Sequence, residues 1–422
     1  MLLKSSKNNM KIYFLKKHCR LCNSKLLTPL LRLPNSPLVD DYCQKKDLKK
    51  NIKKYPLVLM LCKECRHVQL SVVVNPKILY HKYIYQSSSS SDLKNHFYNY
   101  YKDIIKFIKV LPDDLIVDIG SNDGLFLKNF KHFNKVNLLG VDPSPVAKVA
   151  IKNGIKTINS FFNENVCSQI LKKYNKAKII TANNVFSHID KLKSCLENVR
   201  KILSRDGVFI FEVFHVQSII QNKVIDYIYH EHLDYHSITA LEKFFFQNKM
   251  KIINIQKINT KGGSIRVYVS RLESKFKKEI NIINKFKKDE KKYKIFSKNS
   301  YINLLKKINN QKNQIHFLIN QHLNKGYKIL SYGASATSTV FNIIYDLNKY
   351  FAYIIDDNPI RQGRFSPFYR IKIISKNILK NKKKFLVIVS SWRFYDVILK
   401  KNSMSKEAKF VRILPTLKIQ KI

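Results

Sequence analysis

Apolar and polar residues alternate through the middle of the chain in a way that predicts strands followed by helices. Short apolar runs with the length of buried strands are separated by stretches whose apolar residues have helical spacing. Strands and helices in alternation form a parallel sheet with helices on both faces, so we expect a doubly wound α/β domain. The predicted strands span residues 115–120, 137–142, 178–183, 207–213, 251–258 and 264–270.

The C-terminal part of the chain predicts a second α/β section behind a helical connection. Residues from Arg271 to about Lys325 are polar, rich in lysine and free of proline and glycine, so we expect long helices there. The next predicted strands are residues 328–332, 350–356 and 385–390. We therefore expect three domains: an N-terminal module (1–95), an α/β domain (96–270), and a helical linker with a C-terminal α/β domain (271–422).

Four of the seven cysteines form two C-x-x-C pairs in the N-terminal module. These are Cys19, Cys22, Cys62 and Cys65. Two such pairs complete a tetrahedral Cys₄ zinc site, and a site with four protein ligands has no open position for catalysis. We therefore expect a structural zinc ion, with reduced or redox-active thiols as the alternative. Cys43, Cys167 and Cys195 lack a partner at this spacing and are expected to pack in the core.

A loop with two glycines follows the first predicted strand, at residues 120–124 (Gly-Ser-Asn-Asp-Gly). A glycine at a strand end permits a sharp turn and the close approach of a ligand. Asn122 replaces the middle glycine of a dinucleotide loop, which favours S-adenosylmethionine over a nicotinamide cofactor. Asp142 ends the second strand, where a carboxylate can accept hydrogen bonds from ribose hydroxyls. The candidate cofactor-binding residues are Asp118, Gly120, Asn122, Asp123, Gly124, Asp142, Pro143 and Asn183.

The densest group of titratable side chains follows the predicted strand 207–213, at residues 229–236 (Tyr-His-Glu-His-Leu-Asp-Tyr-His). We favour general-base chemistry there, because histidine titrates near neutral pH and a neighbouring glutamate can tune it. A metal site of His230, His232 and His236 is an alternative, although the spacing is not H-E-x-x-H. A purely structural cluster is another. His188, after the predicted strand 178–183, is a further catalytic candidate, or else a core residue.

Composition changes this picture little. The chain has 78 Lys and Arg against 29 Asp and Glu, a formal charge of +49. Lysines are spread through every segment beside many Asn and Ile, which is typical of a coding bias that decorates solvated faces. We therefore do not expect nucleic acid as the main partner, although a basic surface favours a phosphorylated substrate. No leader peptide or apolar run of about 18 residues is evident, so we expect a cytoplasmic protein with no membrane partner.

In this order, the motifs resemble the zinc-containing, S-adenosylmethionine-dependent C-methyltransferases that modify nucleotide-linked deoxysugars at C-3. The resemblance runs over nearly the whole chain. Besides the cysteine pairs and the glycine loop, it rests on residues 183–188 (Asn-Asn-Val-Phe-Ser-His), 229–232 (Tyr-His-Glu-His), 262–266 (Gly-Gly-Ser-Ile-Arg) and 356–363 (Asp-Asp-Asn-Pro-Ile-Arg-Gln-Gly). It implies a class I methyltransferase sheet, an N-terminal zinc-binding module and a C-terminal Rossmann-like domain that binds the substrate.

The resemblance also implies an acceptor and roles for the candidate residues. The acceptor would be a nucleotide-linked 4-keto-deoxyhexose, methylated through an enolate. His232 would be the base and Glu231 would orient it. Tyr229, with Tyr83 or Tyr85, would stabilise the enolate oxygen. His188 would position the sugar or the cofactor.

The chain departs from the family pattern in the C-terminal domain. Residues 335–339 (Ser-Ala-Thr-Ser-Thr) lack the family's lysine, and Phe368 replaces a glycine. Both changes lie where the family holds the nucleotide. A methyltransferase for another small or carrier-bound metabolite, by C- or O-methylation, therefore stays open. A zinc-containing, nucleic-acid-binding protein without enzyme activity is the remote alternative.

Overall fold

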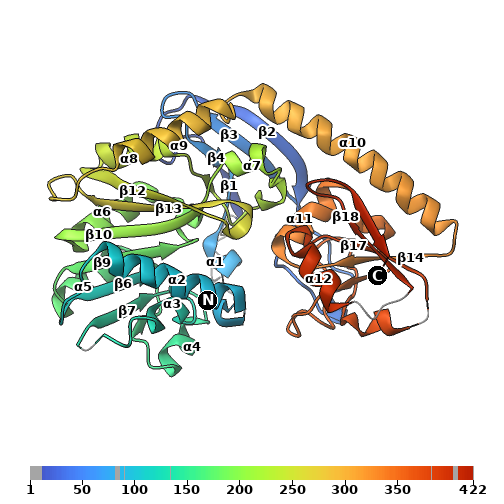
Figure 1. The fold of residues 1–422 in the computed structure, drawn as a ribbon, viewed down its shortest axis with the longest axis horizontal. Helices are drawn as coiled ribbons and strands as arrows, with labels where there is room; N and C mark the ends of the chain where they lie inside the picture. Colours follow the sequence, from blue (N-terminus) through green and yellow to red (C-terminus); the bar gives the residue numbers. More distant parts are fainter. Residues whose placement is uncertain are drawn as a thin grey trace, which may run out of the picture.

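The computed structural model describes residues 12–80, 86–89, 91–133, 135–381, 383–402 and 407–421. Two lobes are visible in Figure 1, one built on a seven-stranded sheet and the other on the C-terminal domain. The strands β2 (Leu27–Ser36) and β3 (Tyr55–Cys62) lie between the lobes, and the long helix α10 (Lys298–Leu323) runs over the C-terminal lobe.

The larger sheet has the strand order β12-β13-β10-β9-β6-β7-β8, in which β13 alone runs antiparallel to its neighbours. This is the order of a class I methyltransferase sheet, so the predicted fold is confirmed. Every residue of β6 is buried, which is typical of a central parallel strand covered on both faces. The strands are β6 (Leu115–Ile119), β7 (Asn137–Val141), β8 (Thr157–Ile158), β9 (Ala177–Asn183), β10 (Leu203–Phe214), β12 (Met250–Ile258) and β13 (Ser264–Arg271).

Helices cover both faces of this sheet. Phe97 and Ile104 of α2 pack with Phe126 of α3 on one face. Leu196 of α6 and Phe244 of α8 belong to the core on the other face. The helices are α2 (Ser91–Phe107), α3 (Leu125–Lys128), α4 (Ala147–Lys152), α5 (Glu164–Lys173), α6 (Leu192–Ile202), α7 (Gln217–Gln221) and α8 (Ile238–Gln247), with the 3₁₀ turns η3 (Phe186–His188), η4 (Ile225–Tyr227) and η5 (Thr260–Gly262).

The N-terminal module forms a four-stranded sheet in the order β11-β4-β3-β2. Its fourth strand, β11 (Asp234–Tyr235), comes from the far end of the histidine segment and pairs antiparallel with β4 (Val68–Leu70). A second small sheet pairs β1 (Tyr13–Leu15) with β5 (Val72–Val74), and α1 (Pro76–Tyr80) follows. The module is therefore built into the methyltransferase-like domain. The division at residues 95/96 falls inside α2, so we propose placing that boundary before the helix.

The C-terminal domain is a six-stranded sheet in the order β16-β15-β14-β17-β18-β19, parallel except for β19. The predicted connecting helices are α9 (Ile280–Lys292) and α10. The strands are β14 (Lys328–Tyr332), β15 (Tyr353–Ile355), β16 (Ile373–Ile374), β17 (Phe385–Val389), β18 (Ala408–Arg412) and β19 (Lys418–Lys421). The helices are α11 (Ala336–Ile344) and α12 (Tyr395–Lys401), with the 3₁₀ turns η6 (Asn348–Tyr350), η7 (Lys376–Lys380) and η8 (Trp392–Phe394).

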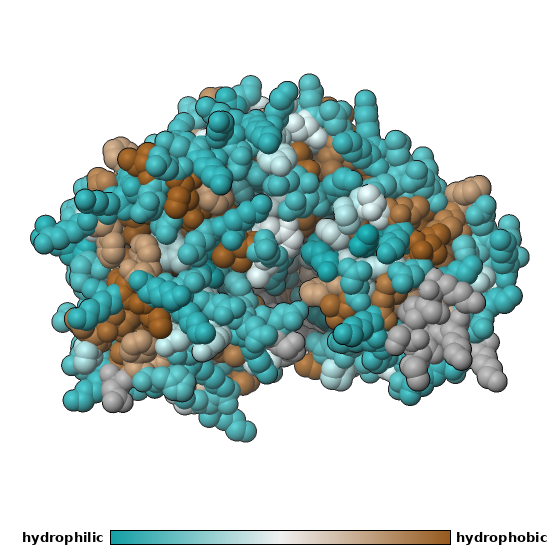
Figure 2. Space-filling view, in the orientation of Figure 1, coloured by the Kyte–Doolittle hydropathy of each residue, from teal (hydrophilic) through white to brown (hydrophobic). Residues whose placement is uncertain are grey.

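One apolar core joins the two lobes. It contains Leu59 of the N-terminal sheet, Ile225 of η4, Ile308 of α10 and Phe341 of α11. Continuous burial of this kind holds domains together more firmly than a polar interface does. The outer surface in Figure 2 is mostly hydrophilic over both lobes, as the spread of lysines predicts. None of the helices in the described ranges is long and apolar enough to cross a membrane.

Candidate active site

The carboxyl ends of the parallel strands of the larger sheet border a cavity of about 570 Å³. Ligands of open α/β sheets bind at this edge, where the strand order reverses between β6 and β9. The cavity brings together two sets of predicted residues. From the cofactor set it is lined by Gly120, Asn122, Asp142, Pro143 and Asn183, and from the catalytic set by His188, Tyr229, Glu231 and His232.

The glycine loop is held open toward the cavity by backbone geometry. Gly120 has φ +72°, and a Cβ there would lie 2.1 Å from the Val185 side chain, so a larger residue does not fit. The carboxyl group of Asp142 accepts hydrogen bonds from the Asn122 N–H at 2.9 Å and the Ser144 N–H at 2.8 Å. These bonds fix the carboxyl group at the cavity wall, and its oxygens keep acceptor capacity for ribose hydroxyls.

Three predicted cofactor residues shape the loop without lining the cavity. Asp118 lies beneath it and accepts hydrogen bonds from Thr181 Oγ1 at 2.6 Å and Asn183 Nδ2 at 3.3 Å; burial, with Asp142 nearby, raises its pKa to about 7. Asp123 accepts from the Ser88 N–H at 2.9 Å, and Gly124 (φ +76°) is the N-cap residue before α3.

His232 is held in a defined tautomer. Its Nδ1 lies 2.7 Å from the carbonyl oxygen of Tyr227. A carbonyl can only accept, so Nδ1 carries the hydrogen and Nε2 keeps its lone pair. Burial, and the charges of His188 and Lys261, lower the pKa of His232 well below the ordinary histidine value. Burial and Lys261 likewise lower the pKa of His188 to about 4. Both imidazoles are therefore neutral at pH 7, as a general base must be.

Glu231 does not orient His232 as expected. The segment makes a tight turn in which the His232 N–H donates to the Tyr229 carbonyl at 3.0 Å. The turn brings the rings of its first and fourth residues, Tyr229 and His232, to a centroid distance of 4.0 Å, and the Nδ1 partner of His232 is the Tyr227 carbonyl instead of Glu231. Burial and the neighbouring Asp40 raise the pKa of Glu231 to about 8. Glu231 is therefore protonated at neutral pH and can donate a hydrogen bond into the cavity.

The other two histidines of the cluster do not converge on His232. His230 packs edge-on against Tyr55, with ring centroids 5.6 Å apart. His236 stacks on Phe186 at 5.6 Å and lies near His67. Within the described ranges, the only group of three or more ligands able to hold a metal ion is the set of four cysteines. The geometry thus does not favour the histidine metal site.

The four cysteines fit a zinc ion. All four Sγ atoms lie within 4.8 Å of one another. The Cys19–Cys65 and Cys22–Cys62 Sγ pairs are 3.5 Å and 3.6 Å apart. A tetrahedron of sulfur atoms about 2.3 Å from a metal has edges of about 3.8 Å, which agrees with these separations.

Arg20, inside the first cysteine pair, connects the zinc site to the histidine segment. Its buried guanidinium donates to the Leu233 carbonyl at 3.2 Å and to Asp190 at 2.9 Å. Nearby, Asp234 Oδ1 lies 2.6 Å from His67 Nε2. The zinc module therefore holds the chain directly after His232.

Sequence reasoning missed two lysines of the cavity wall, Lys191 and Lys261, and two predicted tyrosines cannot be placed. Lys261 lines the cavity from the turn between β12 and β13, with φ +58°, and its charge acts on both His188 and His232. The Gly262-Gly263 pair after it is typical of a tight turn, and this turn follows β12, which runs parallel to β6 and therefore ends at the cofactor edge. Tyr83 and Tyr85 lie outside the described residues.

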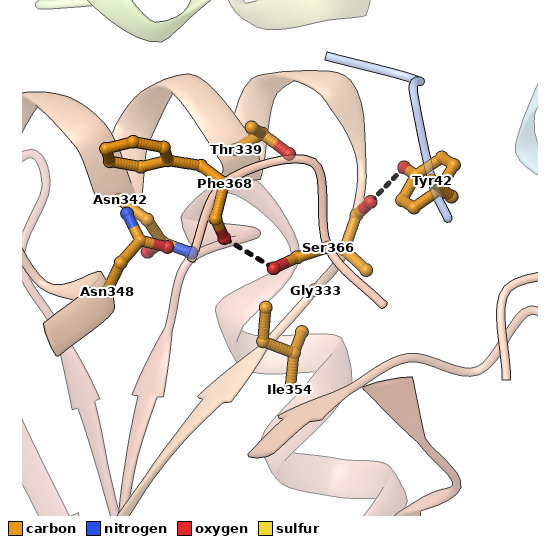
Figure 3. Close-up of a pocket in the computed structure, with 9 residues that line it drawn as sticks. Tyr42, Gly333, Thr339, Asn342, Asn348, Ile354, Ser366 and Phe368 are labelled. Carbon is orange, nitrogen blue, oxygen red and sulfur yellow. Dashed lines mark hydrogen bonds between the residues drawn. The ribbon is translucent and has the colours of Figure 1, made fainter. Parts of the chain in front are cut away.

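A second, much smaller pocket of about 10 Å³ lies in the C-terminal domain, at the start of α11. Both departures from the family pattern are here: Thr339 and Phe368 line it. Figure 3 shows Phe368 beside Asn342 and Asn348, with its carbonyl accepting from Ser366 Oγ at 2.6 Å. Tyr42, from the N-terminal module, donates from its hydroxyl to the Ala334 carbonyl on the opposite side.

Family models match three successive parts of the chain. A zinc binding domain matches residues 19–80, a methyltransferase domain matches residues 95–251, and a C-methyltransferase C-terminal domain matches residues 259–415. The chain therefore carries, in this order, three parts that are similar to the domains of zinc-containing C-methyltransferases. It carries the cofactor site of an S-adenosylmethionine-dependent methyltransferase together with a zinc site.

Among curated proteins, the chain is 27% identical over 253 residues to the C-methyltransferase NovU of Streptomyces niveus. That match covers 60% of this chain and 60% of NovU. A solved S-adenosylmethionine-dependent methyltransferase from Clostridium acetobutylicum is 14% identical with a TM-score of 0.33, covering 42% of this chain and 92% of that one. The plantazolicin methyltransferase BpumL, solved with SAH, is 12% identical with a TM-score of 0.35, covering 44% and 86%.

Proposed function

We propose that this protein is an S-adenosylmethionine-dependent C-methyltransferase that acts on a carbon next to a ketone, at C-3 of a nucleotide-linked 4-keto-deoxysugar. One observation carries the proposal. A histidine with its Nδ1–H bound to the Tyr227 carbonyl, and therefore with a free Nε2 lone pair, lines the same cavity as the cofactor loop. The three family domains and the likeness to NovU support the same activity.

The residues of the cavity have complementary tasks in this reaction. When bound, S-adenosylmethionine supplies an electrophilic methyl group. His232 Nε2 takes the proton from the carbon next to the ketone, which leaves that carbon nucleophilic and puts negative charge on the ketone oxygen. Preorganised donors stabilise such charge best where water is excluded. Among the donors that line the cavity, we assign this task to Tyr229, the protonated Glu231 and the ammonium group of Lys261.

The remaining assignments follow the family resemblance. His188, whose ring lies 5.1 Å from that of His232, positions the sugar or the cofactor beside the base. Tyr83 or Tyr85 adds a further donor to the ketone oxygen. Nucleotide-linked sugars are small molecules of the cytoplasm, so we propose that the protein acts in the cytoplasm.

Isotope transfer tests the proposal. The protein is incubated with methyl-labelled S-adenosylmethionine and thymidine-diphospho-4-keto-6-deoxyglucose, and the product is analysed by mass spectrometry and NMR. Label on a ring carbon is the expected result. Label on oxygen, or no transfer across a panel of such sugars, contradicts it.

A second acceptor class is favoured by the C-terminal pocket. Phe368 and Thr339 line a space of about 10 Å³. The family resemblance implies that the nucleotide is held at this place. A carbonyl compound attached to another carrier would not need that pocket. A Phe368→Gly variant separates the two possibilities, because enlarging the pocket raises affinity for a sugar nucleotide and leaves affinity for another acceptor unchanged.

A further inference from the structure

The turn η4 connects the C-terminal domain to the catalytic histidine. Asp226 of this turn is completely buried, and both partners of its carboxyl group come from η8 of the C-terminal domain. Oδ2 accepts from Trp392 Nε1 at 3.1 Å, and Oδ1 accepts from Arg393 Nη1 at 3.0 Å. A buried carboxyl group that loses such partners is strongly destabilised, so these bonds fix the position of the turn.

The next residue of the same turn orients His232. The Tyr227 carbonyl accepts the Nδ1–H of His232 at 2.7 Å, and the two rings stack with centroids 4.0 Å apart. Phe214, at the end of β10, also stacks on the Tyr227 ring, with centroids 4.5 Å apart. A displacement of Asp226 therefore moves the carbonyl that selects the tautomer of His232.

The other end of this connection lies at the carboxyl edge of the C-terminal sheet. η8 follows β17, and the Ser391 N–H before it donates to the Tyr332 carbonyl at 3.1 Å. Ser391 Oγ also lies 3.0 Å from Ser338 Oγ of α11. Ligands of parallel α/β sheets bind at this edge. An acceptor bound at this edge of the C-terminal sheet therefore lies beside Trp392 and Arg393, which donate hydrogen bonds to Asp226.

We propose that Trp392 and Arg393 are positioning residues for the proposed methyl transfer, acting through Asp226 and the Tyr227 carbonyl to hold His232 in its Nδ1–H tautomer. The inference rests on His232 being the base of the proposed function. It makes the C-terminal domain part of the catalytic arrangement as well as a substrate-binding domain. Misplacing a catalytic group by about 1 Å costs on the order of 100-fold in rate.

The test compares Trp392→Phe, Arg393→Met and Arg393→Lys with wild type, and uses Lys400→Met as the matched control. Lys400 is an exposed cation of the same domain, on α12. Trp392→Phe removes the N–H donor and keeps a smaller aromatic ring, so it serves where Arg393→Met fails to fold. The tautomer is read by ¹⁵N NMR of histidine-labelled protein, with the His232 signal assigned by its absence in His232→Asn.

In wild type and in Lys400→Met, we expect the His232 Nδ1 signal of a protonated nitrogen. In Arg393→Met and Trp392→Phe it should move toward a mixture of tautomers. With thymidine-diphospho-4-keto-6-deoxyglucose, kcat should fall about 10- to 100-fold in Arg393→Met. KM for S-adenosylmethionine should stay within about twofold, and Arg393→Lys should recover part of the loss, because it keeps the charge next to Asp226.

An unchanged His232 signal in both Trp392→Phe and Arg393→Met would overturn the proposal, whatever the turnover. Loss of the tautomer signal with kcat equal to wild type would also overturn it, because positioning would then have no catalytic consequence. If wild-type protein methylates no keto-sugar, the proposed function fails separately. The NMR comparison then still decides whether the C-terminal domain fixes the tautomer.

Discussion

The rings of His188 and His232 lie 5.1 Å apart, brought together from η3 after β9 and from the turn after η4. Each histidine would be repelled by a charge on the other, and burial disfavours a charge on either. The pair is thus kept neutral by its surroundings, and the hydrogen bond of His232 to Tyr227 decides which of its nitrogens is basic. This relationship makes His232 the better candidate for the base.

Replacement of His232 by asparagine should abolish methyl transfer while leaving the cofactor bound. General-base catalysis contributes about 10²- to 10⁴-fold, so we expect kcat to fall by that factor. Cofactor affinity, measured by calorimetry, should change less than twofold. The control is His132→Asn, which removes an exposed histidine. Near-normal turnover in His232→Asn would move the base to His188 or Tyr229.

The pH dependence should report the charge of Lys261. A base acts only when unprotonated, so activity is present above its folded-state pKa and is lost as the pH falls through it. Burial first, then His188 and Lys261, lower the pKa of His232, so the acid limb of kcat should lie below the ordinary histidine range. Lys261→Met removes one of these causes and should move the limb to higher pH.

The matched control for that profile is Lys257→Met, which removes an exposed cation from β12. Its acid limb should coincide with that of wild type. A limb in Lys261→Met that stays in place, or moves to lower pH, would mean that Lys261 does not act on the base.

The sequence was sufficient for the parts of the fold that depend on local pattern. β14 was predicted at its observed bounds, and β6 ends one residue before the predicted Gly120. A continuous apolar strand can occupy few other positions in a fold, because both of its faces must be buried. The residues of the glycine loop and Asp142 were found for the same reason, since strand ends in a parallel sheet share one edge.

The rest of the site depends on contacts that have no local signal. β11 is a two-residue strand whose pairing with β4 is set by the N-terminal module. The orienting group of His232 is a backbone carbonyl, which a motif of side chains cannot reveal, and this is why Glu231 was assigned that task. Lys261 was accessible in principle, because β12 runs parallel to β6 and its turn must lie at the cofactor edge.

Removal of one zinc ligand should affect both stability and catalysis. Native mass spectrometry should find one zinc ion in wild type and none in Cys62→Ser. Folding of a metal module is coupled to metal binding, so we expect the melting temperature to fall by at least about 5 °C. Turnover should also fall, because Arg20 holds the Leu233 carbonyl next to His232.

The control for the zinc prediction is Cys43→Ser. Cys43 is also buried, but it lies outside the cysteine cluster. This variant should keep its zinc ion and its turnover. Zinc retained in Cys62→Ser, or lost in Cys43→Ser, would contradict the assignment of the ligands.

Asp142→Asn tests the cofactor side of the cavity. The asparagine keeps the shape of the side chain and one oxygen acceptor, but it loses the charge and an acceptor for the ribose hydroxyls. Hydrogen bonds to a charged group contribute about 1.5–3 kcal/mol, so affinity for S-adenosylmethionine should fall about 10- to 100-fold by calorimetry. Asp206→Asn, at a largely exposed carboxylate, should bind as wild type does. Unchanged affinity in Asp142→Asn would mean that another residue holds the ribose. A lower affinity with an unchanged melting curve would mean that Asp142 contacts the ligand, because collapse of the loop at Asn122 would also lower the melting temperature.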